Sequence, residues 1–408
     1  MAIVRAPATR DRREGAKRLR ALLLALLVLA VPGAAWPVDA GLPSGRLSPV
    51  PPEQVGAVPV SLLADMGSGQ VLHAHNADLH FAPASMTKVM TAYLAFELIA
   101  RGKLLPEQHL IVSPETAAEW NGKGTSMYLR AGESVSVDML LHGLATASAN
   151  DAAIVLAEGF AGDVPSWTGL MNAEARRLGM NDSHFNTPNG WPDNGKTYVT
   201  ATDLVKLSKA LITRHPALYH RYFGRKRFEW HGAVLQSHDP TVGIVRGADG
   251  IKTGYTREAG YNFLGSAERR GRRLVMVIGG AESGAQRAKA SRELLEWGYS
   301  AWKARPLFAA RAPIGEARVQ GGQAGAVPLV ADSPVYAAIP QAGGEAISLR
   351  IVYDGPLVAP IAVGAEVGQL EIRVGDGEAG HVPLYAGRAV REAGPLDRLR
   401  NGLMNLIP

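Results

Sequence analysis

Residues 81–88 read Phe-Ala-Pro-Ala-Ser-Met-Thr-Lys, and this stretch decides how the chain is interpreted. Its Ser85 and Lys88 stand three residues apart, so in a helix both side chains lie on one face. The amine can then take the hydroxyl proton, and a helix N-terminus favours the oxyanion that forms when such a serine attacks a carbonyl. An ordinary capped helix gives the same four-residue pattern, so the pair on its own is weak evidence for a nucleophile.

Two later motifs strengthen the case for a nucleophilic serine. Residues 148–150 read Ser-Ala-Asn before a stretch with helical periodicity, and residues 252–254 read Lys-Thr-Gly where strand-like sequence resumes. Taken separately, Ser148 and Asn150 would be ordinary helix caps, and Lys252 would be a solvated residue at a strand end. In this order they are the motifs of β-lactamases and penicillin-binding proteins. The order therefore favours an acyl-transfer enzyme that uses a serine.

The chain resembles the low-molecular-mass penicillin-binding D-alanyl-D-alanine carboxypeptidases in five segments: residues 81–88, 146–153, 169–172, 183–190 and 249–256. The resemblance covers residues 58 to 304, and the β-rich part and amphipathic tail that follow are similar to the family's layout. It implies a mixed α/β (α+β) fold, in which a transpeptidase-like domain with an antiparallel sheet and a helical subdomain precedes a small all-β domain.

The resemblance also implies a reaction. A serine-type D-Ala-D-Ala carboxypeptidase removes the terminal D-alanine from peptidoglycan pentapeptide stems through an acyl-enzyme, and β-lactams acylate it. By resemblance, Ser85 attacks the carbonyl between the two D-alanines and Lys88 deprotonates it. Ser148 relays a proton toward the leaving amine, and Asn150 orients the Lys88 amine and the substrate amide.

Four further residues are expected to bind the substrate. The resemblance places Lys252 as a positive charge near the terminal carboxylate and Thr253 as a hydroxyl donor to the same group. Gly254 offers a strand without a side chain, along which an extended peptide can lie. Arg287 stands where family members carry an arginine that helps to hold the carboxylate.

The oxyanion hole is expected to consist of the backbone N–H groups of Ser85 and Tyr255. Tyr255 replaces the histidine that family members often have after Lys-Thr-Gly, and this change leaves the backbone donor in place. Lys88 can serve as a base only if its pKa is well below the free value of about 10.4, which burial beside Lys252 can achieve.

Composition narrows the remaining classes of function. The chain of 408 residues has no cysteine, so it has neither a disulfide nor a thiolate nucleophile. No His-x-Glu or His-x-x-x-His spacing marks a metal site, and we expect no metal and no cofactor. The net charge of +6 includes +5 from residues 1–35, so the rest of the chain is almost neutral and nucleic acid is not an expected partner.

The N-terminal region predicts export. In residues 1–35, basic side chains precede an apolar run of about ten residues and a small-residue cleavage site, which is typical of a signal peptide. The alternative, an uncleaved anchor, is disfavoured because a span needs about 20 residues.

We expect a Pro-rich linker over 36–58, the catalytic domain over 59–305, and the all-β domain over 306–385.

Residues 386–408 are expected to form an amphipathic helix. Within it, residues 395–407 place leucine and isoleucine side chains on one face and polar side chains largely opposite. We expect this helix to bind the membrane surface, so that the enzyme is periplasmic and associated with the outer face of the cytoplasmic membrane. The oligomeric state stays open.

Three alternative functions compete with the carboxypeptidase. A D,D-endopeptidase that cuts peptidoglycan cross-links uses the same residues. A serine β-lactamase of the common class needs a Glu-x-x-Leu-Asn sequence between the second and third motifs, and Glu158, Glu174 and Glu229 lack it. A non-catalytic wall-binding scaffold would be expected to have lost a motif, and all three are intact.

Overall fold

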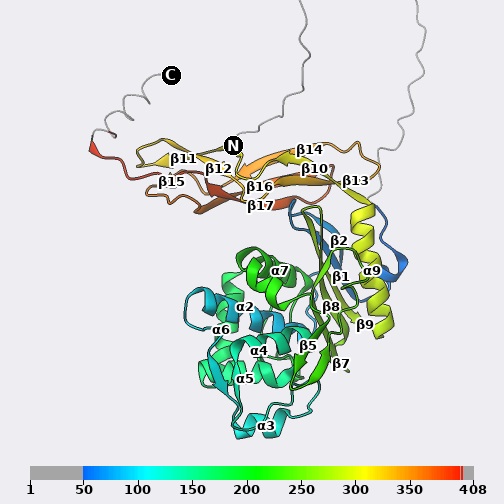
Figure 1. Cartoon of the computed structure of the whole chain (residues 1–408). Helices are drawn as coiled ribbons and strands as arrows, with labels where there is room; N and C mark the ends of the chain where they lie inside the picture. The colour runs from blue at the N-terminus through cyan, green and yellow to red at the C-terminus, as the bar shows by residue number, and fades with distance from the viewer. Residues whose placement is uncertain (1–48, 396, 398–408) are drawn as a thin grey trace, which may run out of the picture.

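The computed structural model describes residues 49–395 and residue 397 and divides into a helix-and-sheet domain and a β-rich domain (Figure 1). The expected signal peptide and residues 36–48 of the expected linker lie outside the described residues. The rest of that linker is not simply extended. Residues Glu53–Gly56 form helix α1, and Val55 and Val58 are buried because they pack into the core beneath helix α9 (Gly284–Ser300).

A five-stranded antiparallel sheet forms the centre of the first domain, in the order β2-β1-β9-β8-β7. The strands are β1 (Val60–Asp65), β2 (Val71–His75), β7 (Ala248–Thr256), β8 (Gly260–Arg269) and β9 (Arg272–Ala281). The short segments after residues 65 and 269 join β1 to β2 and β8 to β9 as antiparallel hairpins.

Both faces of this sheet are covered, which explains why its inner strands β1, β8 and β9 are buried along most of their length. Along β9, Met276 and Ile278 pack with α9, whereas Val275 and Val277 join the core on the helical side. Successive side chains of a strand point to opposite faces, so one strand supplies both cores. Figure 1 shows α9 on one face and the helical subdomain on the other.

Helix α2 (Lys88–Ala100) runs through the middle of the helical subdomain and is buried from Lys88 to Leu98. The other helices of this subdomain are α3 (Pro114–Trp120), α4 (Val137–His142), the π-helical turn η2 (Gly143–Ala147), α5 (Asn150–Ala161), α6 (Val164–Arg177), α7 (Ala201–Arg214) and α8 (Pro216–Tyr222). Two small two-stranded antiparallel sheets accompany them, β3 (His109–Ile111) with β4 (Ser134–Ser136) and β5 (Arg227–Trp230) with β6 (Ala233–Gln236). A side chain caps the N-terminus of α4, α6 and α7: those of Ser136, Asp163 and Thr200 accept a hydrogen bond from a backbone N–H of the first turn.

The second domain has its own core and consists of strands. Its six-stranded sheet has the order β14-β16-β17-β12-β11-β15, and β10 pairs with β13. The strands are β10 (Trp302–Phe308), β11 (Pro313–Gln320), β12 (Ala326–Val330), β13 (Val335–Pro340), β14 (Ile347–Val352), β15 (Leu357–Val358), β16 (Glu366–Val374) and β17 (Gly380–Ala386). Gln70 joins the two domains through hydrogen bonds with both backbone groups of Ala338, at 3.1 and 2.7 Å.

The chain remains in the β domain beyond residue 386, where the sequence suggested that the terminal helix begins. Val390 forms a β-bridge with Ile361, and Glu392 forms one with Gly322. Val390 is buried, so this apolar side chain completes the β core instead of starting a helix. Most of the expected helical segment, residue 396 and residues 398–408, lies outside the described residues.

Candidate active site

Ser85 lies in a 3₁₀ turn, η1 (Ala84–Thr87), that leads directly into α2. The sequence suggested a position at the N-terminus of an α-helix, and the structure places the serine one turn earlier. Lys88 is the first residue of α2 and is fully buried. The tighter turn brings its amine to 2.9 Å from the Ser85 hydroxyl.

Three oxygen atoms surround the Lys88 amine. Besides the Ser85 hydroxyl, they are Oδ1 of Asn150 and the backbone carbonyl of Asn189, each at 2.7 Å. The latter two oxygens can only accept hydrogen bonds, so a neutral amine uses both of its N–H groups on them. Its lone pair then faces the remaining neighbour, the Ser85 hydroxyl. The geometry is therefore that of a base positioned to accept the proton of a nucleophile.

The electrostatic environment favours this neutral form. Burial lowers the pKa of Lys88 well below its usual value, and the charge of Lys252 lowers it further, while Asp151 acts in the opposite direction. Both lowering effects are those that the sequence analysis required of a catalytic lysine.

The second motif stands where η2 meets α5. Ser148 has a left-handed backbone, with φ 62° and ψ 27°, which a residue with a side chain adopts at a cost of about 1–2 kcal/mol. The hydroxyl of Thr125 donates to the Ser148 carbonyl at 2.6 Å and holds this conformation. Strained positions of this kind are concentrated at functional sites.

The amide of Asn150 is held in one orientation. Its Nδ2 donates to the backbone carbonyl of Lys123 at 2.9 Å, so Oδ1 is the atom that faces Lys88. The Asn150 side chain therefore does not cap α5, whose N-cap residue Ala149 offers no side-chain hydrogen bond. The adjacent Asp151 is buried and accepts hydrogen bonds from Ser126, Met127, Leu129 and Ala152, at 2.6 to 3.2 Å.

The third motif lies on β7, beside the Ser85 turn. A Cβ atom added to Gly254 would overlap the carbonyl oxygen of Pro83 and approach Ala84 Cβ to 3.3 Å. The glycine is thus required for the close packing of β7 against the turn that carries Ser85, a reason that local sequence did not supply. Lys252 is buried, and burial together with the charge of Arg287 lowers its pKa to about 7, while Asp239 opposes the shift.

These residues surround one cavity of about 360 Å³, which we call the catalytic cavity. Of the residues expected at the site, Ser85, Ser148, Asn150, Thr253, Gly254, Tyr255 and Arg287 line it. The rest of the lining consists of Gly124, Thr125, Gly190, Trp191, His238, Thr256 and Tyr261. The amines of Lys88 and Lys252 belong to buried side chains adjoining this lining.

Arg287 reaches the catalytic cavity from α9. Its guanidinium lies 5.7 Å from the ring centre of Tyr261, which stacks on Tyr255 at 4.2 Å. The Nε atom is buried and has no hydrogen-bond partner among the described residues. A buried donor without a partner is costly, and an anionic ligand would satisfy it.

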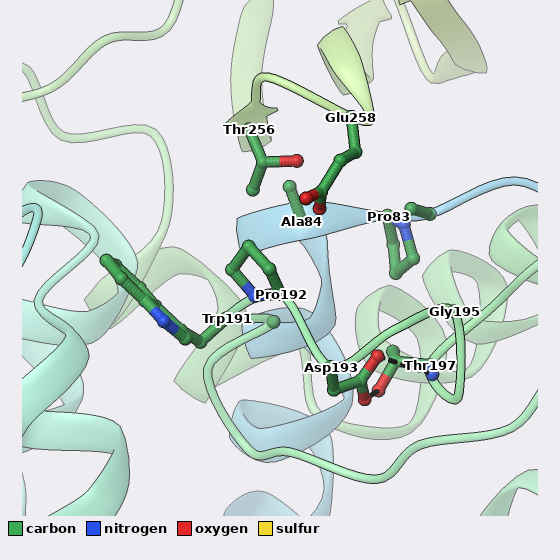
Figure 2. A pocket seen from close by; sticks show the side chains of 11 residues that line it. Pro83, Ala84, Trp191, Pro192, Asp193, Gly195, Thr197, Thr256 and Glu258 are labelled. Carbon is green, nitrogen blue, oxygen red and sulfur yellow. Dashed lines mark hydrogen bonds between the residues drawn. The ribbon is translucent and has the colours of Figure 1, made fainter.

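Sequence reasoning missed several contributors. The carbonyls of Asn189 and Lys123 act through the backbone, so residue type gives no signal, although Asn189-Gly190 stands in one of the segments that carry the resemblance. Trp191 lines the catalytic cavity. Together with Pro192 it also lines a smaller adjoining pocket of about 30 Å³ (Figure 2). Figure 2 shows Glu258 on the opposite side of that small pocket. His238 also lines the catalytic cavity and was not expected there.

Comparisons with known proteins cover both domains. The family model described as D-alanyl-D-alanine carboxypeptidase matches residues 50–283, and that of the penicillin-binding protein 5 C-terminal domain matches residues 302–392. D-alanyl-D-alanine carboxypeptidase DacD of Salmonella typhimurium is 34% identical, over 83% of this chain and 87% of that protein. The DacD of Escherichia coli is 33% identical, over 86% and 91%.

Solved structures agree with these matches. Penicillin-binding protein 5 of Haemophilus influenzae superposes with a TM-score of 0.68 at 29% identity, covering 84% of this chain and 99% of that one. Penicillin-binding protein 6B of Escherichia coli gives 0.63 at 30% identity, covering 83% and 97%. Ampicillin-bound penicillin-binding protein D2 of Listeria monocytogenes gives 0.54 at 31% identity, covering 60% and 98%. These matches confirm the resemblance and the fold class expected from the sequence: the chain belongs to the serine-type D-alanyl-D-alanine carboxypeptidase family of penicillin-binding proteins.

Proposed function

We propose that the enzyme removes the terminal D-alanine from peptidoglycan pentapeptide stems through an acyl-enzyme on Ser85. The observation that carries the proposal is the 2.9 Å contact between the Ser85 hydroxyl and a buried amine whose other two neighbours are carbonyl oxygens. Such an amine has its lone pair directed at the hydroxyl, which makes that serine a nucleophile at neutral pH.

In the acylation step, neutral Lys88 accepts the Ser85 proton while Oγ attacks the carbonyl of the penultimate D-alanine. The backbone N–H groups of Ser85 and Tyr255 stabilise the oxyanion. The tetrahedral intermediate collapses as a proton passes by way of Ser148 to the leaving nitrogen, so D-alanine departs with its amine protonated. Asn150 holds the Lys88 amine throughout and contacts the substrate amide.

In the deacylation step, water attacks the ester carbonyl and Lys88 accepts the water's proton. Oγ leaves and is protonated again, which restores Ser85 and frees the shortened stem. Each residue thus returns to its starting protonation state. The same nucleophile opens the ring of a β-lactam. The opened molecule stays attached to Ser85 as a single adduct, so no leaving group departs.

The other end of the catalytic cavity suits the terminal carboxylate. Thr253 supplies a hydroxyl, and Arg287 supplies a guanidinium with a buried donor that lacks a partner among the described residues. Lys252 lies beside Thr253, and its lowered pKa means that a bound anion would stabilise its charged form. A carboxylate bound here would give the Arg287 donor an acceptor and would lie near the charge of Lys252.

The test is release of free D-alanine from a pentapeptide stem by the purified enzyme, with Ser85→Ala and Lys88→Ala as comparisons. We expect release by the wild type alone, because nucleophile and base act as one unit. A cross-linked dimer of stems is assayed in parallel. Cleavage of the dimer without release of terminal D-alanine would instead identify a D,D-endopeptidase.

We further propose that the mature enzyme is periplasmic and binds the outer face of the cytoplasmic membrane through its C-terminal segment. The support is the signal-peptide pattern of residues 1–35 and the apolar face of residues 395–407, in sequence that lies largely outside the described residues. No helix in the part of the chain that the structure describes is long and apolar enough to span a bilayer.

Truncation tests this attachment. The cut belongs after Gly394, because residues up to Ala393 hydrogen-bond within the β domain. We expect the truncated protein to keep carboxypeptidase activity while losing its binding to lipid vesicles. Equal partitioning of the full-length mature and truncated proteins between vesicles and buffer would disprove the attachment.

A further inference from the structure

The loop between β6 and β7 brings a histidine, His238, to the catalytic cavity, and the reaction described above does not use it. His238 lines the cavity together with Thr253 and Arg287, the residues assigned to the substrate's terminal carboxylate. The charges of Lys252 and Arg287 both act on its imidazole, so His238 lies near the groups that are expected to bind an anion.

The loop holds this histidine in place from both sides. The backbone N–H of Ser237 donates to the Lys226 carbonyl at 2.9 Å. The Asp239 carboxylate accepts hydrogen bonds from the backbone and hydroxyl of Thr241, both at 2.7 Å. Such contacts on each side of one residue leave little freedom to its backbone.

The same loop is tied to the helix that carries Arg287. The Nε of Arg292 on α9 donates to the Pro240 carbonyl at 2.7 Å. Arg287 and His238 therefore belong to two segments that are hydrogen-bonded to each other next to the cavity. A charge on the imidazole would act on the same ligand atoms as the guanidinium.

The charged and titratable groups around His238 come from three elements and its own loop. They are Lys252 of β7, Arg287 of α9, Tyr255 and Tyr261 on the cavity wall, and Asp239 beside it. Burial lowers the pKa of His238, and the charges of Lys252 and Arg287 lower it further. In the free enzyme the imidazole is therefore neutral at pH 7 and becomes charged only in more acidic medium.

We propose that His238 is a specificity residue that contacts the terminal carboxylate and adds a positive charge to the pocket as the medium becomes acidic. This inference rests on the proposed function, since it requires a substrate with a free carboxylate at that end. A carboxylate bound beside the imidazole raises the proton affinity of the imidazole. By linkage, protonation of the imidazole raises the affinity of the pocket for the carboxylate by the same factor. An opposite charge at contact distance shifts a pKa by about one unit or more, so the preference for a carboxylate should grow roughly tenfold.

The experiment compares two peptides that end in D-alanyl-D-alanine, one with a free terminal carboxylate and one with that carboxylate amidated. The ratio of their kcat/KM values is measured from pH 5 to pH 8. Because both peptides need the same Lys88 base, its titration cancels in the ratio. In the wild type, the ratio of the carboxylate peptide to the amide should show a first rise as the pH falls through 7, where Lys252 gains its proton. It should show a second rise of roughly tenfold at lower pH, where His238 gains its proton.

His238→Gln should lose the second rise and keep the first, whereas His238→Arg should hold the ratio high throughout the acidic range. His381→Gln, which changes an exposed histidine of the β domain, is the matched control and should retain both rises. Thermal melts establish that each variant is folded. If His238 had only a structural role, its replacement would change the rates for both peptides, and the ratio of their kcat/KM values would still show both rises.

Retention of the second rise in His238→Gln would overturn the inference, as would its loss in His381→Gln. A His238→Arg enzyme that behaves like His238→Gln would also overturn it, because charge would then not be the cause. Failure of the wild type to release D-alanine from the carboxylate peptide at every pH would instead refute the proposed function, and the inference with it.

Discussion

Replacement of Gly254 by alanine tests the packing of β7 against the nucleophile's turn. The added methyl group would overlap the Pro83 carbonyl oxygen and lie 3.3 Å from both Ala84 Cβ and Met86 N. The opposing atoms are mostly backbone, so they cannot rotate away as the end of a side chain could. Relief therefore requires β7 and the Ser85 turn to separate by a substantial fraction of an ångström.

Two quantities follow from this displacement. Overpacking of this kind typically costs about 1–3 kcal/mol of unfolding free energy. Misplacement of reacting groups by about 1 Å can cost roughly 100-fold in rate. We therefore expect Gly254→Ala to remain folded and to acylate with fluorescent penicillin roughly 100-fold more slowly than the wild type.

Gly265→Ala is the matched control on the neighbouring strand β8. There the added Cβ would lie 2.7 Å from Phe263 and 2.8 Å from Met276, against side chains of the core beneath α9, whereas Met86 of the Ser85 turn belongs to the core on the helical side. It should lower thermal stability without slowing acylation comparably. Acylation of Gly254→Ala at the wild-type rate, or an equal loss of rate in both variants, would refute the argument that this glycine positions the nucleophile.

Three further predictions concern charge. Asp151→Asn places an NH₂ group against backbone N–H donors, so it should lower the unfolding free energy by about 1–3 kcal/mol; an unchanged urea midpoint would contradict this. Lys252→Ala should slow cleavage of a free-carboxylate peptide more than that of its amide, and equal losses in kcat/KM would reject its assigned role. Burial opposes ionisation of Glu97, but hydrogen bonds from Arg177 and His215 lower its pKa to about 2. Its contribution to stability is therefore present above the unfolded-state pKa and is lost as the pH falls through about 2, so Glu97→Gln should destabilise the protein at pH 7 but no longer near pH 2.

Local spacing made part of the site predictable. Ser85 and Lys88 are neighbours on one turn, and the three motifs occur in a recognisable order, so the sequence predicted that the three motifs meet at one site, and the structure brings them together around one cavity. The β-rich sequence after residue 305 likewise predicted a separate all-β domain, and the structure shows β-strands there.

Long-range backbone contacts made the rest unpredictable. The Lys88 amine is oriented by the Asn189 carbonyl, 101 residues away in the chain, and Asn150 by the Lys123 carbonyl, 27 residues away. Every residue type carries a backbone carbonyl, so neither composition nor motif spacing indicates which carbonyl forms these hydrogen bonds. The same holds for Gly254, whose purpose depends on the distance between two segments that only the fold brings together.

The central claim is that Ser85 is the nucleophile, and mass measurement with peptide mapping after treatment with penicillin tests it most directly. The account predicts one adduct per wild-type chain, on the peptide that contains Ser85, and no adduct on the folded Ser85→Ala protein. An adduct of equal yield on Ser85→Ala, or one mapped to Ser148 in the wild type, would contradict it.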